Sequence, residues 1–83
     1  MEITDIRIKK VEDKNRLKAV VAITIDNSFV IHELRLIEGD KGLFLAMPSR
    51  KLADGSFRDI AHPINIETRE LLEKLIIEAY QAL

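Results

Sequence analysis

Apolar and polar residues alternate along three segments in the first half of the chain. In residues 3–11, isoleucines and charged residues occupy alternate positions, as expected of a strand with one buried face. Residues 17–25 show the strongest strand pattern, because apolar residues, several of them β-branched, recur at every second position. These residues are Leu17, Ala19, Val21, Ile23 and Ile25. Residues 29–37 form a third strand-like segment that would run back along the second. The three segments therefore predict antiparallel strands.

The apolar positions of residues 29–37 change register along the segment. They fall on odd numbers first and on even numbers later, as in Phe29, Ile31, Leu34 and Leu36. Since a slip of one residue turns side chains to the other face, we expect a β-bulge near His32 or burial on both faces. Turn-forming residues predict chain reversals at residues 12–15, 26–28 and 38–42.

The middle of the chain predicts a further hairpin. An apolar run is stopped by Pro48, the dipeptide Asp54–Gly55 favours a reversal, and residues 57–61 resume an extended pattern. The connection would carry two adjacent cations, Arg50 and Lys51, into solvent. These cations can contact an anion or simply keep the tip soluble.

The C-terminal segment predicts a helix at about residues 66–82. Its apolar residues recur at three- and four-residue spacing and form one stripe: Leu72, Leu75, Ile76, Ala79, Tyr80 and Leu83. Asn65 is the expected N-cap, and Glu67 lies in the first turn, where a carboxylate suits the helix dipole.

Strands followed by one helix indicate an α+β fold in a single domain spanning residues 1–83. We expect the strands within residues 2–62 to form an antiparallel sheet of four to five strands, built from hairpins or a meander. The C-terminal helix should pack on one face of this sheet. Phe29, Phe44 and Phe57 lie inside strand patterns, so we expect them in the core.

One helix covers one face of one sheet, yet Val20 and Ala22 place apolar residues on the other face of their strand. Leu71 and Ile77 similarly lie off the main helical stripe. Monomers rarely expose large apolar patches, so this pattern predicts a homodimer. The alternative is a small domain that simply shows some apolar side chains.

The composition indicates a globular protein with 47% hydrophobic and 33% charged residues. Without cysteine, the chain can form neither a disulfide nor a thiolate metal site, which fits a reducing cytoplasm. We see no secretory signal and no apolar run near the roughly 20 residues that span a bilayer. We therefore expect a cytoplasmic protein without a membrane partner.

Cations gather at two hairpins, although 13 Lys and Arg against 14 Asp and Glu give a net charge of −1. Such clustering can present a basic face to nucleic acid. The candidate contacts are Arg50, Lys51, Arg58, Lys9, Lys14 and Arg16. Alternatively, these cations prevent edge-to-edge pairing of strands. The net charge itself does not indicate a polyanionic partner. The acidic C-terminal helix is also unsuited to binding in a DNA groove.

Catalysis is not expected, although His32 and His62 could in principle act as bases. The chain lacks a nucleophile motif, metal-ligand spacing and a glycine-rich phosphate cradle. We expect His62 to make a satisfied hydrogen bond and His32 to have a structural role at the register change. The sequence predicts no enzyme, cofactor, metal or small-molecule substrate.

Four motifs resemble the stage V sporulation protein G family of small bacterial septation proteins. They are Gly-Leu-Phe at residues 42–44, Ala-Met-Pro-Ser at residues 46–49, Asp-Gly at residues 54–55 and Phe-Arg-Asp-Ile-Ala-His-Pro-Ile-Asn at residues 57–65. The resemblance runs from Glu2 to the last helix. It implies a dimeric cytoplasmic regulator that binds DNA or RNA and influences cell division, sporulation and transcription.

In this family a basic element follows the Met-Pro-Ser motif, and here that element falls on Arg50 and Lys51. The resemblance therefore makes these two residues the first-choice contacts, with Arg58 as a second. The alternative function is a protein-interaction module in septation or sporulation control that does not bind nucleic acid directly.

Overall fold

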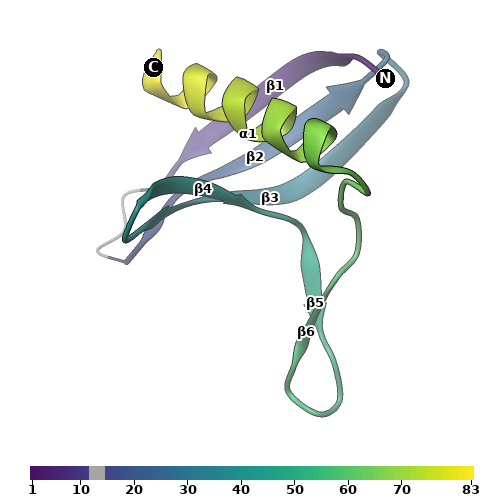
Figure 1. The fold of residues 1–83 in the computed structure, drawn as a ribbon, viewed down its shortest axis with the longest axis vertical. Coiled ribbons are helices and arrows are strands. Elements are labelled where there is room, and N and C mark those ends of the chain that lie inside the picture. Colours follow the sequence, from purple (N-terminus) through teal and green to yellow (C-terminus); the bar gives the residue numbers. More distant parts are fainter. Residues whose placement is uncertain (12–14) are drawn as a thin grey trace.

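The computed structural model describes residues 1–11 and 15–83 and shows two antiparallel sheets and one helix (Figure 1). The main sheet has the order β1-β2-β3-β4, from β1 (Ile3–Lys10), β2 (Leu17–Ile25), β3 (Phe29–Gly39) and β4 (Gly42–Ala46). A separate ribbon pairs β5 (Ser49–Lys51) with β6 (Phe57–Asp59), and α1 (Ile66–Gln81) follows. The expected α+β class, the four-stranded meander and the C-terminal helix are confirmed.

The predicted central hairpin is only partly correct. The apolar run before Pro48 pairs with β3 as strand β4, whereas residues 57–59 pair with residues 49–51. Arg50 and Lys51 consequently lie within strand β5 and not in the connection between the strands. This correction matters because a strand, unlike a loose tip, alternates its side chains between two faces.

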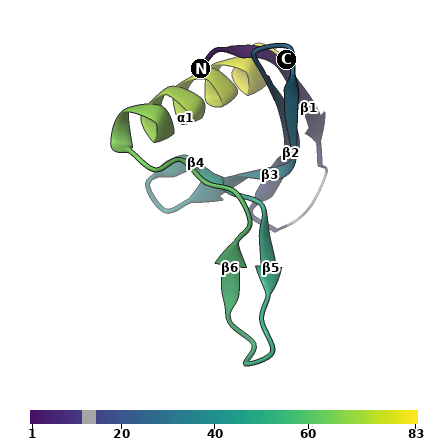
Figure 2. The same cartoon turned by 90° about the vertical axis from the view of Figure 1, so that its right-hand side faces the viewer.

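The main sheet curves around α1, so that its concave side faces the helix (Figures 1 and 2). The helix contacts both β1 and β4, the two edge strands of the sheet. The Glu73 carboxylate accepts a hydrogen bond from the Leu45 backbone N–H of β4 at 3.2 Å, and Lys10 of β1 places its Nζ 5.5 Å from the Tyr80 ring centre. The helix thus closes the open side of the curved sheet.

The core lies between this concave face and the helix, as the alternation in residues 17–25 predicted. Its buried side chains are Ala19, Val21, Ile23, Leu34, Leu36, Leu45, Met47, Leu72 and Ile76. Leu72 and Ile76 confirm the apolar stripe, but Leu83 lies beyond the end of the helix and is exposed.

The register change in residues 29–37 is caused by a β-bulge in β3. Of the two expected alternatives, a bulge or burial on both faces, the first is therefore correct. Ala22 of β2 faces two residues, His32 and Glu33, between the regular pairs Val21–Leu34 and Ile23–Ile31. Glu33 takes a positive φ of 67°, a conformation common at bulges. The extra residue returns Leu34 and Leu36 to the concave face.

Local turn and cap chemistry also follows the sequence. Asp26 and Asn27 both adopt positive φ, which suits the tight reversal between β2 and β3. The reversal expected at residues 38–42 is shorter, since only residues 40–41 lie outside the strands. Residues 12–14 of the first predicted turn are outside the described residues.

The Asn65 Oδ1 accepts a hydrogen bond from the Thr68 N–H at 2.7 Å, which confirms the N-cap.

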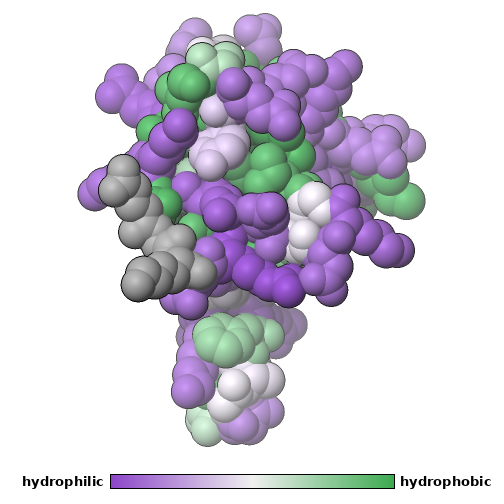
Figure 3. Space-filling model, turned by 90° about the vertical axis from the view of Figure 1, so that its left-hand side faces the viewer, coloured by the Kyte–Doolittle hydropathy of each residue, from purple (hydrophilic) through white to green (hydrophobic). Residues whose placement is uncertain are grey.

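Several large apolar side chains lie at the surface, and Figure 3 shows hydrophobic patches on the body and on the ribbon. Phe29 and Phe57 are 73% and 70% exposed, and Phe44 is 43% exposed. The expectation that these three rings belong to the core is therefore wrong. The alternation of apolar and polar residues did not predict burial here. Phe29 adjoins a turn, Phe44 lies on an edge strand and Phe57 lies on a ribbon away from the body.

Within residues 1–11 and 15–83, the single helix is too short and too polar to cross a membrane.

Candidate nucleic-acid interface

The β5–β6 ribbon, residues 49–59, forms an arm that projects away from the sheet and the helix (Figures 1 and 2). Its three pairs are Ser49–Asp59, Arg50–Arg58 and Lys51–Phe57. Paired residues share a face of an antiparallel ribbon, and consecutive pairs alternate between faces. The two arginines therefore occupy one face, and the other two pairs occupy the opposite face.

The arm cations form no ion pair with any carboxylate that the structure describes. Across residues 1–11 and 15–83, the ion pairs within 4.0 Å are Arg7–Asp5, Arg16–Asp40 and Lys18–Glu38. Asp59 follows Arg58 in sequence but belongs to the other face of the arm, so the two do not pair. Arg50, Lys51 and Arg58 are exposed and available to an external anion.

The tip of the arm is held by a compact hydrogen-bonded turn. The Leu52 N–H donates to the Ser56 carbonyl at 2.7 Å, and the Gly55 N–H donates to the Leu52 carbonyl at 3.0 Å. Gly55 has a φ of 90°, the conformation that a three-residue hairpin loop requires at this position. The turn fixes the two strands of the arm relative to each other.

Asp54 reinforces this turn through its side chain. Its Oδ1 accepts hydrogen bonds from the Ser56 hydroxyl at 2.6 Å and from the Ser56 N–H at 3.0 Å. These donors, the hydroxyl first, lower the pKa of the Asp54 carboxyl below its ordinary value. Asp54 thus has a structural role at the tip.

Two other predicted contacts, Lys9 and Arg16, do not join the arm. Arg16 pairs with Asp40 at 2.9 Å in the turn before β4, whereas the arm leaves from the far end of β4. Lys9 is exposed on edge strand β1. Lys14 lies outside the described residues. Of the five candidates that the structure describes, three are thus brought together: Arg50, Lys51 and Arg58.

A hollow of about 410 Å³ lies where the arm meets the body. Sequence reasoning missed two cations that line it, Arg35 of β3 and Arg69 of α1. The Arg35 guanidinium donates to the Ser49 hydroxyl at 3.5 Å. The other lining residues are Leu45, Ala46, Met47, Ser49, Phe57 and Asp59. Arg35 pairs with Ala46 and lies on the side of the sheet away from the core, which the alternation of β3 could have indicated. Its position close to Arg69 depends on the tertiary fold and could not be predicted.

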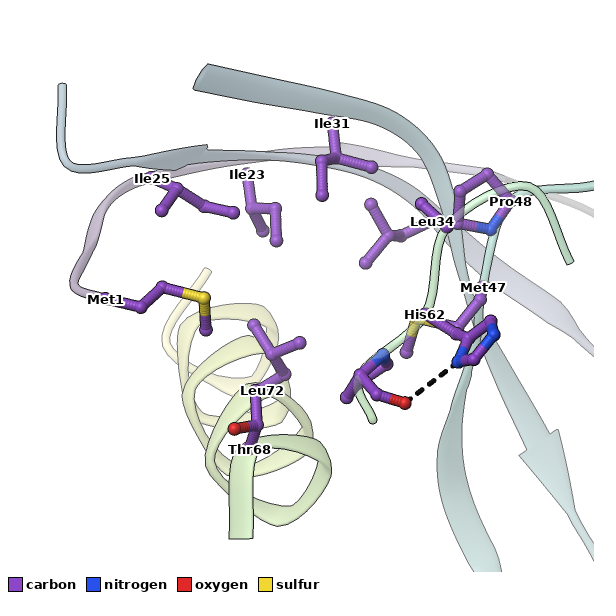
Figure 4. A pocket seen from close by; sticks show the side chains of 12 residues that line it. Met1, Ile23, Ile25, Ile31, Leu34, Met47, Pro48, His62, Thr68 and Leu72 are labelled. Atoms are coloured by element: carbon purple, nitrogen blue, oxygen red, sulfur yellow. Dashed lines mark hydrogen bonds between the residues drawn. The ribbon is translucent and has the colours of Figure 1, made fainter. Parts of the chain in front are cut away.

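A second cavity, of about 120 Å³, lies among apolar side chains between the sheet, the start of α1 and the root of the arm (Figure 4). Its few polar side chains include His62, whose Nδ1 donates to the Pro63 carbonyl at 2.9 Å. The expected satisfied hydrogen bond of His62 is therefore confirmed, and His32 lies in the bulge as expected. Within the described ranges, no three acidic or histidine side chains gather as metal ligands.

Comparison with known proteins places these features in a family. The SpoVG family model matches residues 1–82. A relative from Agathobacter rectalis is 62% identical over 98% of this chain and 93% of its own length, and one from Lachnospira eligens is 57% identical over 98% and 92%. A third, from Caldicellulosiruptor bescii, is 55% identical over 99% and 93%. All three carry the name "Putative septation protein SpoVG". The chain therefore belongs to the SpoVG family, as its sequence motifs indicated.

Proposed function

We propose that this protein is a non-enzymatic, homodimeric regulator of septation and sporulation that binds nucleic acid through its arm. The observation that carries the proposal is a group of exposed cations on the arm, Arg50, Lys51 and Arg58, which pair with no carboxylate within residues 1–11 and 15–83. The septation role rests on the names of the relatives. Binding to nucleic acid would let the protein regulate gene expression, and we expect it to act in the cytoplasm.

Opposed arginines support an anionic partner. Like charges directly opposite each other destabilise a strand pair, and Arg50 faces Arg58. A phosphate between or beside the two guanidinium groups would remove this repulsion and accept bidentate hydrogen bonds. Lys51 adds a third positive charge on the opposite face of the same ribbon.

Exposed apolar residues support self-association. Ile60, Ile64 and Ile66 are all largely exposed along the link between the arm and α1. Burying such side chains against a second copy would be favourable, and two-fold dimers are the commonest assemblies. A dimer would also present two arms to one polyanion.

The test is a binding titration of the double variant Arg50→Ala/Lys51→Ala on DNA and RNA. We expect lower affinity for nucleic acid. The slope of log affinity against log salt concentration should also become shallower, by about 0.9 for each duplex phosphate contact that is lost. Thermal stability and the mass from light scattering should stay unchanged. The matched control, Lys41→Ala/Lys74→Ala, removes two exposed cations outside the arm. Unchanged binding of the arm variant, or an equal loss in both variants, would refute the site.

The alternative is a protein-interaction module, which the same exposed apolar residues and the edge strand β4 favour. Recovery of a protein partner after nuclease treatment, together with no retardation of labelled DNA or RNA, would support this alternative.

A further inference from the structure

We propose that the hollow at the root of the arm receives an unpaired guanine base from a single-stranded nucleic acid. This inference rests on the proposed function and assigns one more site to it. The starting observation is Phe57, an exposed ring on the arm that forms part of the wall of the hollow. An exposed aromatic face is the platform on which unpaired bases stack.

The hollow offers polar groups of both signs beside that ring. Arg35 and Arg69 supply guanidinium groups, Ser49 a hydroxyl and Asp59 a carboxylate. A volume of about 410 Å³ lies within the range of small-molecule sites, which typically combine apolar walls with a few polar groups. Leu45, Ala46 and Met47 contribute the apolar part of the lining.

The described carboxylate and guanidinium groups that line the hollow are not joined in ion pairs. Asp59 lines the same hollow as Arg35 and Arg69, but no ion pair within 4.0 Å joins it to a cation in the described part of the chain. The carboxylate and the guanidinium groups therefore lie apart. A ligand that fits between them needs hydrogen-bond donors for Asp59 and acceptors for the arginines.

Guanine meets both requirements. It is the base that presents two adjacent N–H donors, N1–H and the N2 amino group, on its pairing edge, which suits a carboxylate. Its O6 and N7 atoms are acceptors suited to arginine. The base must be unpaired, because its pairing edge is engaged in a duplex.

The two faces of the arm then have separate tasks. Phe57 and Asp59 belong to the face that lines the hollow, whereas Arg50 and Arg58 occupy the opposite face, where flanking phosphates can bind. Lys51 pairs with Phe57 and places a cation beside the stacking ring. A single strand passing over the arm could contact both faces.

The test uses fluorescence anisotropy with oligothymidine and oligouridine that carry one central guanine, inosine or adenine. Inosine lacks the N2 amino group, so the wild-type protein should bind the guanine strands most tightly and lose affinity with inosine. Asp59→Ala removes both acceptor oxygens and should therefore bind guanine and inosine strands equally. Comparing the deoxy and ribo series distinguishes DNA from RNA as the source of the base.

Phe57→Ala should weaken binding of the guanine strand by about 5- to 150-fold, the usual range for one base–aromatic stack. Phe57→Tyr should restore it. The matched control is Phe29→Ala, because Phe29 is equally exposed but lies on β3. Circular dichroism checks that each variant is folded.

Equal affinity for all central bases, or equal effects of the Phe57 and Phe29 variants, would overturn the guanine site. So would tighter binding of the corresponding duplex. In each case the arm proposal would stand if Arg50→Ala/Lys51→Ala still reduced binding. If that double variant bound as tightly as the wild type, the proposed function itself would fail.

Discussion

Arg50 lies directly opposite Arg58 across the β5–β6 ribbon, with no carboxylate within ion-pair distance of either among the described residues. Cross-strand neighbours in antiparallel pairs lie about 5 Å apart at their Cα atoms. The protein thus holds two positive charges together on an arm that leaves the body. Stability alone does not favour this arrangement, whereas binding of an anion does.

Replacing Arg58 with Glu should separate the stability of the arm from its function. Arg58→Glu turns a repulsive cross-strand pair into an attractive one, so the arm should gain about 0.2–1 kcal/mol. Amide hydrogen exchange at Leu52, whose N–H bonds to Ser56 across the arm, should slow. Affinity for nucleic acid should fall in the same variant.

Arg58→Gln removes the repulsion without adding an attraction, so its effects on exchange should be intermediate. Faster exchange at Leu52 in Arg58→Glu would show that the arginines do not repel each other appreciably.

The turn at the tip of the arm should weaken in acid. The pKa of Asp54 is lowered in the folded protein, so its stabilising contribution is complete above the ordinary carboxyl pKa and is lost as the pH falls below about 4. Ser56→Ala removes the hydroxyl donor, the largest cause, and should raise the pKa of Asp54 towards its ordinary value. The Ser56 N–H bond remains, so the return should be incomplete.

Carbon-detected NMR titration of the Asp54 carboxyl measures this change. Ser28→Ala, at another turn, provides the control because its hydroxyl donates to the Asp26 carbonyl and not to Asp54. An Asp54 pKa that is identical in the wild type and Ser56→Ala would contradict the geometry of the tip.

Asn65→Ala should destabilise the protein by about 1 kcal/mol, because the Thr68 N–H at the start of α1 loses its acceptor. Asn65→Asp retains a side-chain oxygen at the same position and should recover most of the loss. Urea denaturation of the three proteins measures these differences. A loss as large in Asn65→Asp as in Asn65→Ala would mean that the cap hydrogen bond is not the cause.

Glu73→Ala should cost about 1–3 kcal/mol, because the N–H of buried Leu45 on β4 loses its charged acceptor beneath the helix. Glu73→Gln keeps an acceptor oxygen and should cost less. Glu70→Ala, at an exposed position of the same helix, is the matched control. Equal free energies of unfolding for the Glu70 and Glu73 alanine variants would exclude a role for this contact in joining α1 to the sheet edge.

The sequence predicted which cations belong to the proposed arm site but not how they are arranged. Arg50, Lys51 and Arg58 stood out because cations cluster around a turn dipeptide, and the structure places all three on one ribbon. Their pairing was not predicted, because it depends on which residue of β6 faces each residue of β5. The hollow was not predicted either, since Arg35 and Arg69 come from a strand and a helix that only folding brings together.

The sequence by itself determined the features that depend on local periodicity and local hydrogen bonds. These are the buried alternation of β2, the helix and its Asn65 cap, and each follows from the geometry of neighbouring residues. The register change in residues 29–37 was also visible, but only the pairing of β2 with β3 decided that it is a bulge. Tertiary structure decided that β4 pairs with β3 and leaves the arm free, and therefore that Phe57 is exposed. An apolar strand can pair with more than one partner, and the curved sheet closing around α1 selects the partner that buries Leu45 and Met47.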